Sequence, residues 1–227
     1  MTDRPLVEEL RLFLGDPQTW WGPASIPLRL GEHLLLSAVA VLAAAALVIP
    51  PALWAAHRRR GVVAAAAVVN IGRAVPTFGI LVVVVVWLGL GPWPALVALV
   101  ALSGPPMFTN TVAAVLAVDP AVLESAWGMG MTGRAVLMKV ELPLALPVIA
   151  EGIRIAISQV IATATLAALA AGGGLGRFIV DGFAKRDQGE LLMGAVLVAA
   201  VAVVAEMLFT RGQRRLVPSQ ASAEGSR

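Results

Sequence analysis

The sequence predicts an all-α membrane protein with about five transmembrane helices. Of its 227 residues, 59% are hydrophobic and only 14% are charged, and the mean hydropathy is +0.86. Soluble domains carry about 25% charged residues and have shorter apolar runs. Residues 34–56, 74–118 and 155–176 form runs of 23, 45 and 22 residues without a single charge. A membrane span needs about 20 apolar residues, so each run is long enough to cross a bilayer.

Turn and proline signals divide the apolar runs into five expected spans: residues 34–56, 62–90, 95–116, 147–171 and 191–209. The second span is long, and we expect Pro76 to kink it. A tight turn at residues 89–94 precedes the third span. Trp87 and Trp93 lie on either side of this turn, where interfacial aromatic residues belong.

Polar segments flank the membrane domain, which we assign to residues 30–215. In residues 1–29 the side chains of Leu6, Leu10, Phe13 and Leu14 recur at helical spacing before Trp20 and Trp21. This pattern predicts a short helix in the membrane interface on the outer side, with an unordered terminus as the alternative. We expect no cleavable signal, because acidic and basic residues are mixed here. Residues 216–227 are polar and small, which predicts a disordered cytoplasmic tail.

Basic residues predict the orientation of the chain in the plasma membrane of a prokaryote. Five spans place the two ends on opposite sides. If the first span ends inside, nine basic residues lie inside: Arg58, Arg59, Arg60, Arg134, Lys139, Arg211, Arg214, Arg215 and Arg227. Six lie outside: Arg4, Arg11, Arg29, Arg177, Lys185 and Arg186. The excess of inner basic residues predicts an external N-terminus, a cytoplasmic C-terminus and a cytoplasmic segment between spans three and four.

This cytoplasmic segment carries the signals of a docking helix at about residues 119–138. Asp119 followed by Pro120 is a typical helix start. Small residues recur along the helix and would let another backbone approach closely: Ala121, Ser125, Ala126, Gly128 and Gly130. Glu124, Ala126 and Gly130 fall across one side of a short helix and its following turn, where Gly130 permits either a positive φ or the close approach of another surface. The prolines at 143 and 147 interrupt the chain before span four. A plain amphipathic connector is the alternative interpretation.

The same segment resembles the EAA loop of the permeases of bacterial ABC importers. The matching pattern is Glu124-Ser125-Ala126, three residues, Gly130, nine residues, Val140, one residue, and Leu142-Pro143. Ser125 stands for the usual alanine and Val140 for the usual isoleucine. Residues 70–76 (NIGRAVP) and 171–176 (AGGGLG) also resemble this superfamily.

Within the superfamily, the chain resembles the osmoprotectant branch, which takes up glycine betaine, carnitine and choline. The resemblance covers about residues 31–215 and rests on residues 31–34, 118–121, 128–132, 141–147, 152–154 and 163–168. Methionine-type importers share several of these stretches, so an amino-acid permease is the alternative. Residues 49–52 (IPPA) depart from the Pro-Leu-Gly that is usual in the branch.

The resemblance implies the transmembrane domain of a type I, methionine-permease-like importer. It implies two ATP-binding cassette subunits, a second permease copy or a homologous permease, and an extracytoplasmic substrate-binding protein. ATP and Mg would bind to the partner ATPase, with no cofactor in this chain. The residues that would couple transport to the ATPase are Glu124, Ser125, Ala126, Gly130, Leu142 and Pro143.

Polar residues and glycines within the spans are candidates for the transport path or its gate. They are Arg73, Pro76, Ser158, Gln159, Thr163, Thr165, Gly172, Gly173 and Gly174. We expect the glycine run to form a flexible turn at an outer gate. Glu151 and Arg154 are three residues apart, so they can pair on one helix face. No group of aromatic residues inside the spans could cage a quaternary ammonium, so that cage is expected on the binding protein.

Several other functions lack a signal in the sequence. No Gly-Lys pair occurs, so there is no Walker A loop, and we expect a transport subunit without its own ATPase activity rather than an enzyme. The spans carry neither a nucleophile–base pair nor an acidic dyad, so we expect no catalytic residue. Without cysteine there is no Cys-ligated metal, and the basic residues follow membrane topology rather than nucleic acid. A passive channel stays open as an alternative, although no filter sequence is visible.

Overall fold

The computed structural model describes residues 5–62, 66, 67, 69 and 74–216 of the chain. No strand occurs in these residues, and the chain is built from helices joined by short turns. The helices of the membrane domain are α3 (Ile26–Arg58), α5 (Thr77–Leu88), α6 (Pro92–Leu116), α9 (Leu142–Thr163) and α11 (Gln188–Leu216). Shorter elements are α1 (Leu6–Gly15), α2 (Pro17–Trp21), α7 (Pro120–Gly128), α8 (Gly133–Val136), the π-helical η1 (Leu137–Glu141), the 3₁₀ η2 (Ala164–Ala170) and α10 (Gly176–Lys185).

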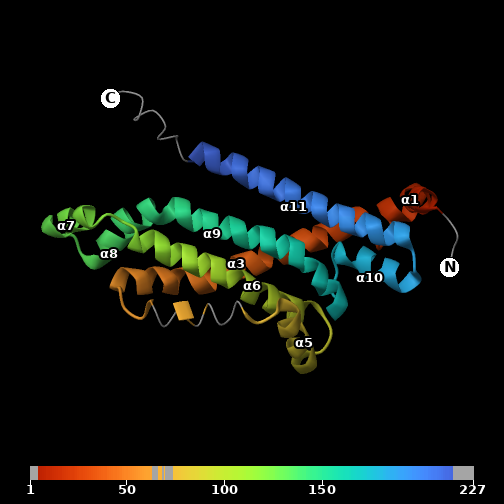
Figure 1. Cartoon of the computed structure of the whole chain (residues 1–227), viewed down its shortest axis with the longest axis horizontal. Coiled ribbons are helices and arrows are strands. Elements are labelled where there is room, and N and C mark those ends of the chain that lie inside the picture. Colours follow the sequence, from red (N-terminus) through yellow and green to blue (C-terminus); the bar gives the residue numbers. More distant parts are fainter. Residues whose placement is uncertain (1–4, 63–65, 68, 70–73, 217–227) are drawn as a thin grey trace.

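Helix α6 is the centre of the bundle and packs against α3 on one side and α9 on the other. Figure 1 shows these three helices side by side along the length of the molecule, with α11 along their edge. Among the 18 most apolar consecutive residues of α6, 56% are buried, whereas only 6% are buried in the corresponding stretch of α11. The α3–α6–α9 core is rich in small side chains, among them Ala40, Ala44 and Ala156. Small residues let helix backbones approach closely where no polar contact holds them.

Four helical stretches of the described chain are long and apolar enough to cross a membrane. They are Pro17–Arg58, Pro92–Leu116, Gly133–Ala170 and Gln188–Gly212. These stretches contain the predicted first, third and fifth spans, and the predicted fourth span except its last residue, with most ends extended by several residues. The predicted second span, 62–90, is described only in part and includes α5. At 12 residues, α5 is about 18 Å long and cannot cross a bilayer core of about 30 Å by itself.

Two local predictions differ from the structure, and one helix was not predicted. Pro76 was expected to kink a continuous helix, but it is the extended residue immediately before α5. Leu142-Pro143 and Pro147 were expected to interrupt the chain before span four, but α9 begins at Leu142 and carries Pro147 inside it. Pro143 lies in the first turn of α9, directly after the π-helical η1. Helix α10 was not predicted at all, and it packs against α11.

The two ends of the bundle carry different elements. Figure 1 shows α7 and α8 at one end and α1 and α10 at the other. Helix α1 packs on α11, and the rings of Phe13 and Phe178 meet edge to face with their centroids 5.7 Å apart. The predicted helix in residues 1–29 is therefore confirmed as a helix.

Candidate coupling segment and transport path

The candidate coupling segment begins at a well-formed helix start. The side chain of Asp119 accepts a hydrogen bond from the backbone nitrogen of Ala121 at 2.9 Å, and Pro120 occupies the first turn of α7. This is the N-cap arrangement that the sequence predicts. Helix α7 ends at Gly128, and the backbone nitrogen of Met129 still donates to the oxygen of Ser125 at 3.1 Å.

The predicted helix over 119–138 is instead two helices with a turn between them. Gly130 has a φ of +76°, a left-handed conformation that favours glycine, and a Cβ at this position would meet nothing within 4 Å. Its backbone nitrogen donates to the oxygen of Trp127 at 2.9 Å. Thr132 then caps α8 by accepting from the nitrogen of Ala135 at 3.4 Å. The chain reverses here because glycine permits the turn and threonine starts the next helix.

The two sides of α7 differ in exposure. Leu123 and Ala126 are buried with Val118 and Val136 in a small core of their own. Glu124 and Ser125 are exposed, as is Gly130 in the turn. The expectation that Ala126 shares a side with Glu124 and Gly130 is therefore wrong, because two residues along a helix lie about 200° apart. Ala126 packs α7 against the rest of the chain, while Glu124, Ser125 and Gly130 are exposed.

The end of the coupling segment is joined to α3 by a contact between two side chains. Nδ1 of His57 lies 2.5 Å from Oε2 of Glu141, and the Glu141 side chain is only 5% exposed. Glu141 is the last residue of η1, and α9 continues directly from it with Leu142, half-buried in the core, and Pro143, exposed. Helices α3 and α9 are thus joined beside α7. The sequence could not predict this pair, because its partners are 84 positions apart.

The polar candidates for the transport path do not converge on one place within the chain. Ser158 donates to the carboxylate of Glu206 on α11 at 2.7 Å, and Thr165 donates to the backbone oxygen of Ala162 at 3.1 Å. Gln159 is exposed and Thr163 is half-buried at the end of α9. Pro76 precedes α5, and Arg73 lies outside the described residues together with Asn70.

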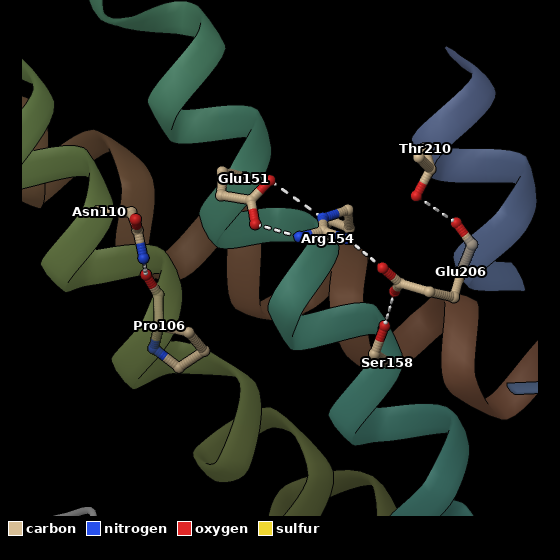
Figure 2. A network of polar contacts seen from close by, with 7 residues as sticks. All are labelled: Pro106, Asn110, Glu151, Arg154, Ser158, Glu206 and Thr210. Carbon is tan, nitrogen blue, oxygen red and sulfur yellow. Dashed lines mark hydrogen bonds and ion pairs between the residues drawn. The ribbon is translucent and has the colours of Figure 1, made fainter. Parts of the chain in front are cut away.

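A charged network joins α9 to α11, as Figure 2 shows. Arg154 forms ion pairs with Glu151 on its own helix and with Glu206 on α11. The predicted Glu151–Arg154 pair is therefore confirmed. Sequence reasoning missed Glu206, although a single carboxylate within the otherwise uncharged predicted span 191–209 is a signal that some partner neutralises it.

The glycine run after η2, residues 172–174, is fixed by contacts with neighbouring elements. The backbone nitrogen of Gly174 donates to Oε2 of Glu32 at 2.8 Å, and Arg29 pairs with the same carboxylate oxygen at 2.9 Å. Gly174 has a φ of +90°, and a Cβ there would lie 3.2 Å from Nδ1 of the buried His33. A Cβ at Gly172 would lie 2.7 Å from the oxygen of Ala167. Gly174 therefore packs closely against α3 and Gly172 against η2, so the turn that was expected to be flexible is constrained by its neighbours.

Comparison with known proteins identifies the family. Residues 48–221 match the family model described as "Binding-protein-dependent transport system inner membrane component". The chain belongs to this family. It is therefore a multi-pass inner-membrane permease component of an ABC importer, and it shares the fold of the methionine-permease-like type I importers.

Relatives of this permease cover most of its length. It is 35% identical over 190 residues to the glycine betaine/carnitine/choline transport system permease protein OpuCB of Bacillus subtilis, covering 84% of this chain and 88% of the relative. It is also 38% identical over 149 residues to the osmoprotectant import permease protein OsmY of Salmonella typhimurium, covering 66% and 63%. The solved structure of the inward-facing MetNI methionine ABC transporter matches 89% of this chain with a TM-score of 0.75 at 20% identity, a likeness of fold alone.

Proposed function

We propose that this permease is the transmembrane subunit of an ATP-driven importer for osmoprotectants of the quaternary-amine class, such as glycine betaine, carnitine and choline. The observation that carries the proposal is the 35% identity to the glycine betaine/carnitine/choline permease of Bacillus subtilis over 84% of this chain. The match extends through the bundle and the coupling segment rather than covering one motif.

In the proposed assembly, α7 sits in a cleft of a partner ATPase subunit on the cytoplasmic side. Glu124, Ser125 and Gly130 are exposed and available to the partner, whereas Ala126 is buried and fixes the helix to the chain. Exposed Pro143 and half-buried Leu142 then position the first turn of α9. Two ATPase subunits would bind ATP and Mg, and their closure would move two such helices together.

The proposed motion passes from α7 into the bundle through two connections. The chain from α8 through η1 to α9 is one uninterrupted helical rod, so a displacement of its first residues moves α9. The buried His57–Glu141 pair joins the start of this rod to the end of α3. Both connections act on α3 and α9, two of the helices that pack against the central α6.

The proposed path lies between two permease copies. In a single chain, side chains fill the space between α3, α6 and α9, where residues such as Met107 and Ala156 are fully buried. The exposed Gln159 on α9 is then available to face a second, identical or homologous copy. A separate extracytoplasmic binding protein would deliver the solute, because the described spans carry no cluster of aromatic rings to hold a quaternary ammonium tightly.

Transport into vesicles tests the proposed substrate class. The permease would be reconstituted with its ATPase and its binding protein, and uptake of labelled choline, glycine betaine, carnitine and methionine would be measured. We expect ATP-dependent uptake of at least one quaternary amine that stops when the binding protein is left out. Uptake of methionine with no uptake of any quaternary amine would instead assign the permease to the amino-acid class.

A further inference from the structure

A basic cavity lies at the end of the molecule that carries α7. Its volume is about 680 Å³, and it is bounded by the last turns of α3, the end of α7 and the start of the α8–η1 rod. Three arginines line it: Arg58, Arg60 and Arg134. Two tryptophans, Trp54 and Trp127, form its aromatic walls.

The arginines of this cavity have no anionic partner in the described part of the chain. None of the three takes part in an ion pair there, and no carboxylate lines the cavity. The nearby Glu141 is already held by His57, which forms part of the wall. Three like charges around one cavity repel one another, and an anion between them relieves that repulsion. Guanidinium groups match phosphate especially well, because they donate two parallel hydrogen bonds.

The tryptophans indicate where the anion comes from. Trp54 lies one helical turn before Arg58, inside the predicted first span, and its side chain is 60% exposed on the surface of an apolar helix. The guanidinium carbon of Arg58 lies 5.8 Å from the centroid of the Trp54 ring. Exposed tryptophan beside arginine is typical of the membrane–water boundary. The cavity therefore borders the bilayer through Trp54, which favours a lipid over the acidic surface of a partner protein.

We propose that this cavity binds the headgroup of an anionic phospholipid. The phosphate lies among Arg58, Arg60 and Arg134, and the tryptophan walls contact the upper part of the acyl chains. Basic pockets between helices at the membrane surface are sites of this chemistry. Because the cavity is bounded by α3, α7 and the rod leading to α9, the bound lipid contacts the elements that the proposed coupling motion moves.

Lipid titration of the full-length permease in detergent, followed by native mass spectrometry, tests this site. The probes are phosphatidylglycerol, phosphatidylcholine and inorganic phosphate. We expect the unmodified chain to retain phosphatidylglycerol in preference to phosphatidylcholine. Arg58→Gln combined with Arg134→Gln should weaken phosphatidylglycerol binding about thirtyfold, at about fivefold for each basic group at a membrane surface. The control, Lys139→Gln combined with Arg211→Gln, removes two exposed charges that do not line the cavity and should weaken binding clearly less than the arginine variant does.

A second variant tests the cavity without removing charge. A Cβ at Gly133 would lie 3.4 Å from Nε2 of His57 and 3.5 Å from the Trp127 ring, so Gly133→Leu fills the space between them and should also lower phosphatidylglycerol retention. Equal retention of both lipids by the unmodified chain, or equal losses in the arginine variant and its control, would overturn the site. Arginine-dependent binding of inorganic phosphate would make it a free-phosphate site. Unchanged lipid binding with loss of ATPase co-purification would make it a protein contact.

Discussion

Gly152 lies at a close contact between α9 and α6. A Cβ at this position would come 2.7 Å from Cβ of Asn110 and 2.9 Å from the backbone oxygen of Pro106. Both neighbours belong to α6, and the backbone there cannot move aside without separating the helices. Gly152 is therefore a packing requirement of the bundle rather than a residue of the transport path.

We predict that Gly152→Ala lowers the free energy of unfolding of the permease by about 1–3 kcal/mol, the usual cost of overpacking a helix contact. Thermal unfolding of the purified chain in detergent measures the change. Gly31→Ala is the matched control, since Gly31 is also inside a helix but its added Cβ would meet nothing within 4 Å. The control should be neutral or slightly stabilising. Equal destabilisation by both variants would show that helix propensity, and not the contact with α6, controls the result.

Gly130 illustrates a second requirement at the scale of single residues. Its φ of +76° is a backbone conformation that favours glycine, so the turn itself accounts for glycine at this position. The space around it within the chain is open, so the chain itself sets no limit on side-chain size. A limit on size, if one is measured, must then come from a partner.

At the scale of elements, Arg154 is the link between α9 and α11. It lies between the carboxylates of Glu151 and Glu206, while Ser158 donates to the far oxygen of Glu206. Removal of the arginine leaves two carboxylates near each other without a cation. Removal of Glu206 leaves Arg154 still paired with Glu151, so the loss should be smaller.

We predict that Arg154→Ala destabilises the permease more than Glu206→Ala, and that the double variant costs less than the sum of the two. Residues in one charged network usually show coupling of roughly 0.5 kcal/mol or more. Thermal unfolding of the four proteins completes the cycle. Arg177→Ala, which breaks the i,i+4 pair with Asp181 within α10, is the control and should cost less than about 0.5 kcal/mol. Additive costs at Arg154 and Glu206 would mean that the contact contributes nothing to holding α11.

The elements show where sequence reasoning succeeds and where it stops. Hydropathy, together with the residues that start and end helices, located the apolar cores of α3, α6, α9 and α11. Asp119-Pro120 located the start of α7. Both kinds of signal depend only on neighbours along the chain. Glycine at position 130 indicated a turn, but the expected helix bounds of 119–138 ran past it, since periodicity does not reveal where a positive φ ends a helix. Contacts such as Gly174 with Glu32, 142 positions apart, follow only from the packing of the bundle.

At the scale of the whole molecule, orientation in the membrane is the property on which the proposed function depends. The coupling segment and the basic cavity lie at one end of the bundle, and the glycine run and α10 lie toward the other. The basic residues predict that the α7 end is cytoplasmic. This remains a prediction from charge alone.

Cysteine labelling in intact cells tests the orientation, and the chain has no native cysteine to confuse the result. Thr132→Cys, in the turn before α8, should react with a membrane-impermeant maleimide only after the cells are opened. Pro92→Cys, at the start of α6, should react in intact cells. Labelling of residue 132 from outside, or of residue 92 only from inside, would show that the topology is the reverse of the predicted one. Helix α7 could then not contact an ATPase in the cytoplasm.

The central claim is that α7 transmits ATP hydrolysis to the bundle, and one measurement tests it most directly. Uptake and substrate-stimulated ATP hydrolysis would be measured in vesicles that hold the permease, its ATPase and its binding protein. Because Glu124 is exposed on α7, Glu124→Lys should leave membrane insertion and abundance near normal and abolish both activities, and Gly130→Trp should do the same. Glu8→Lys, an equal charge reversal on the exposed face of α1, should retain them. Transport at the normal rate by Glu124→Lys or Gly130→Trp would show that α7 is only a connector.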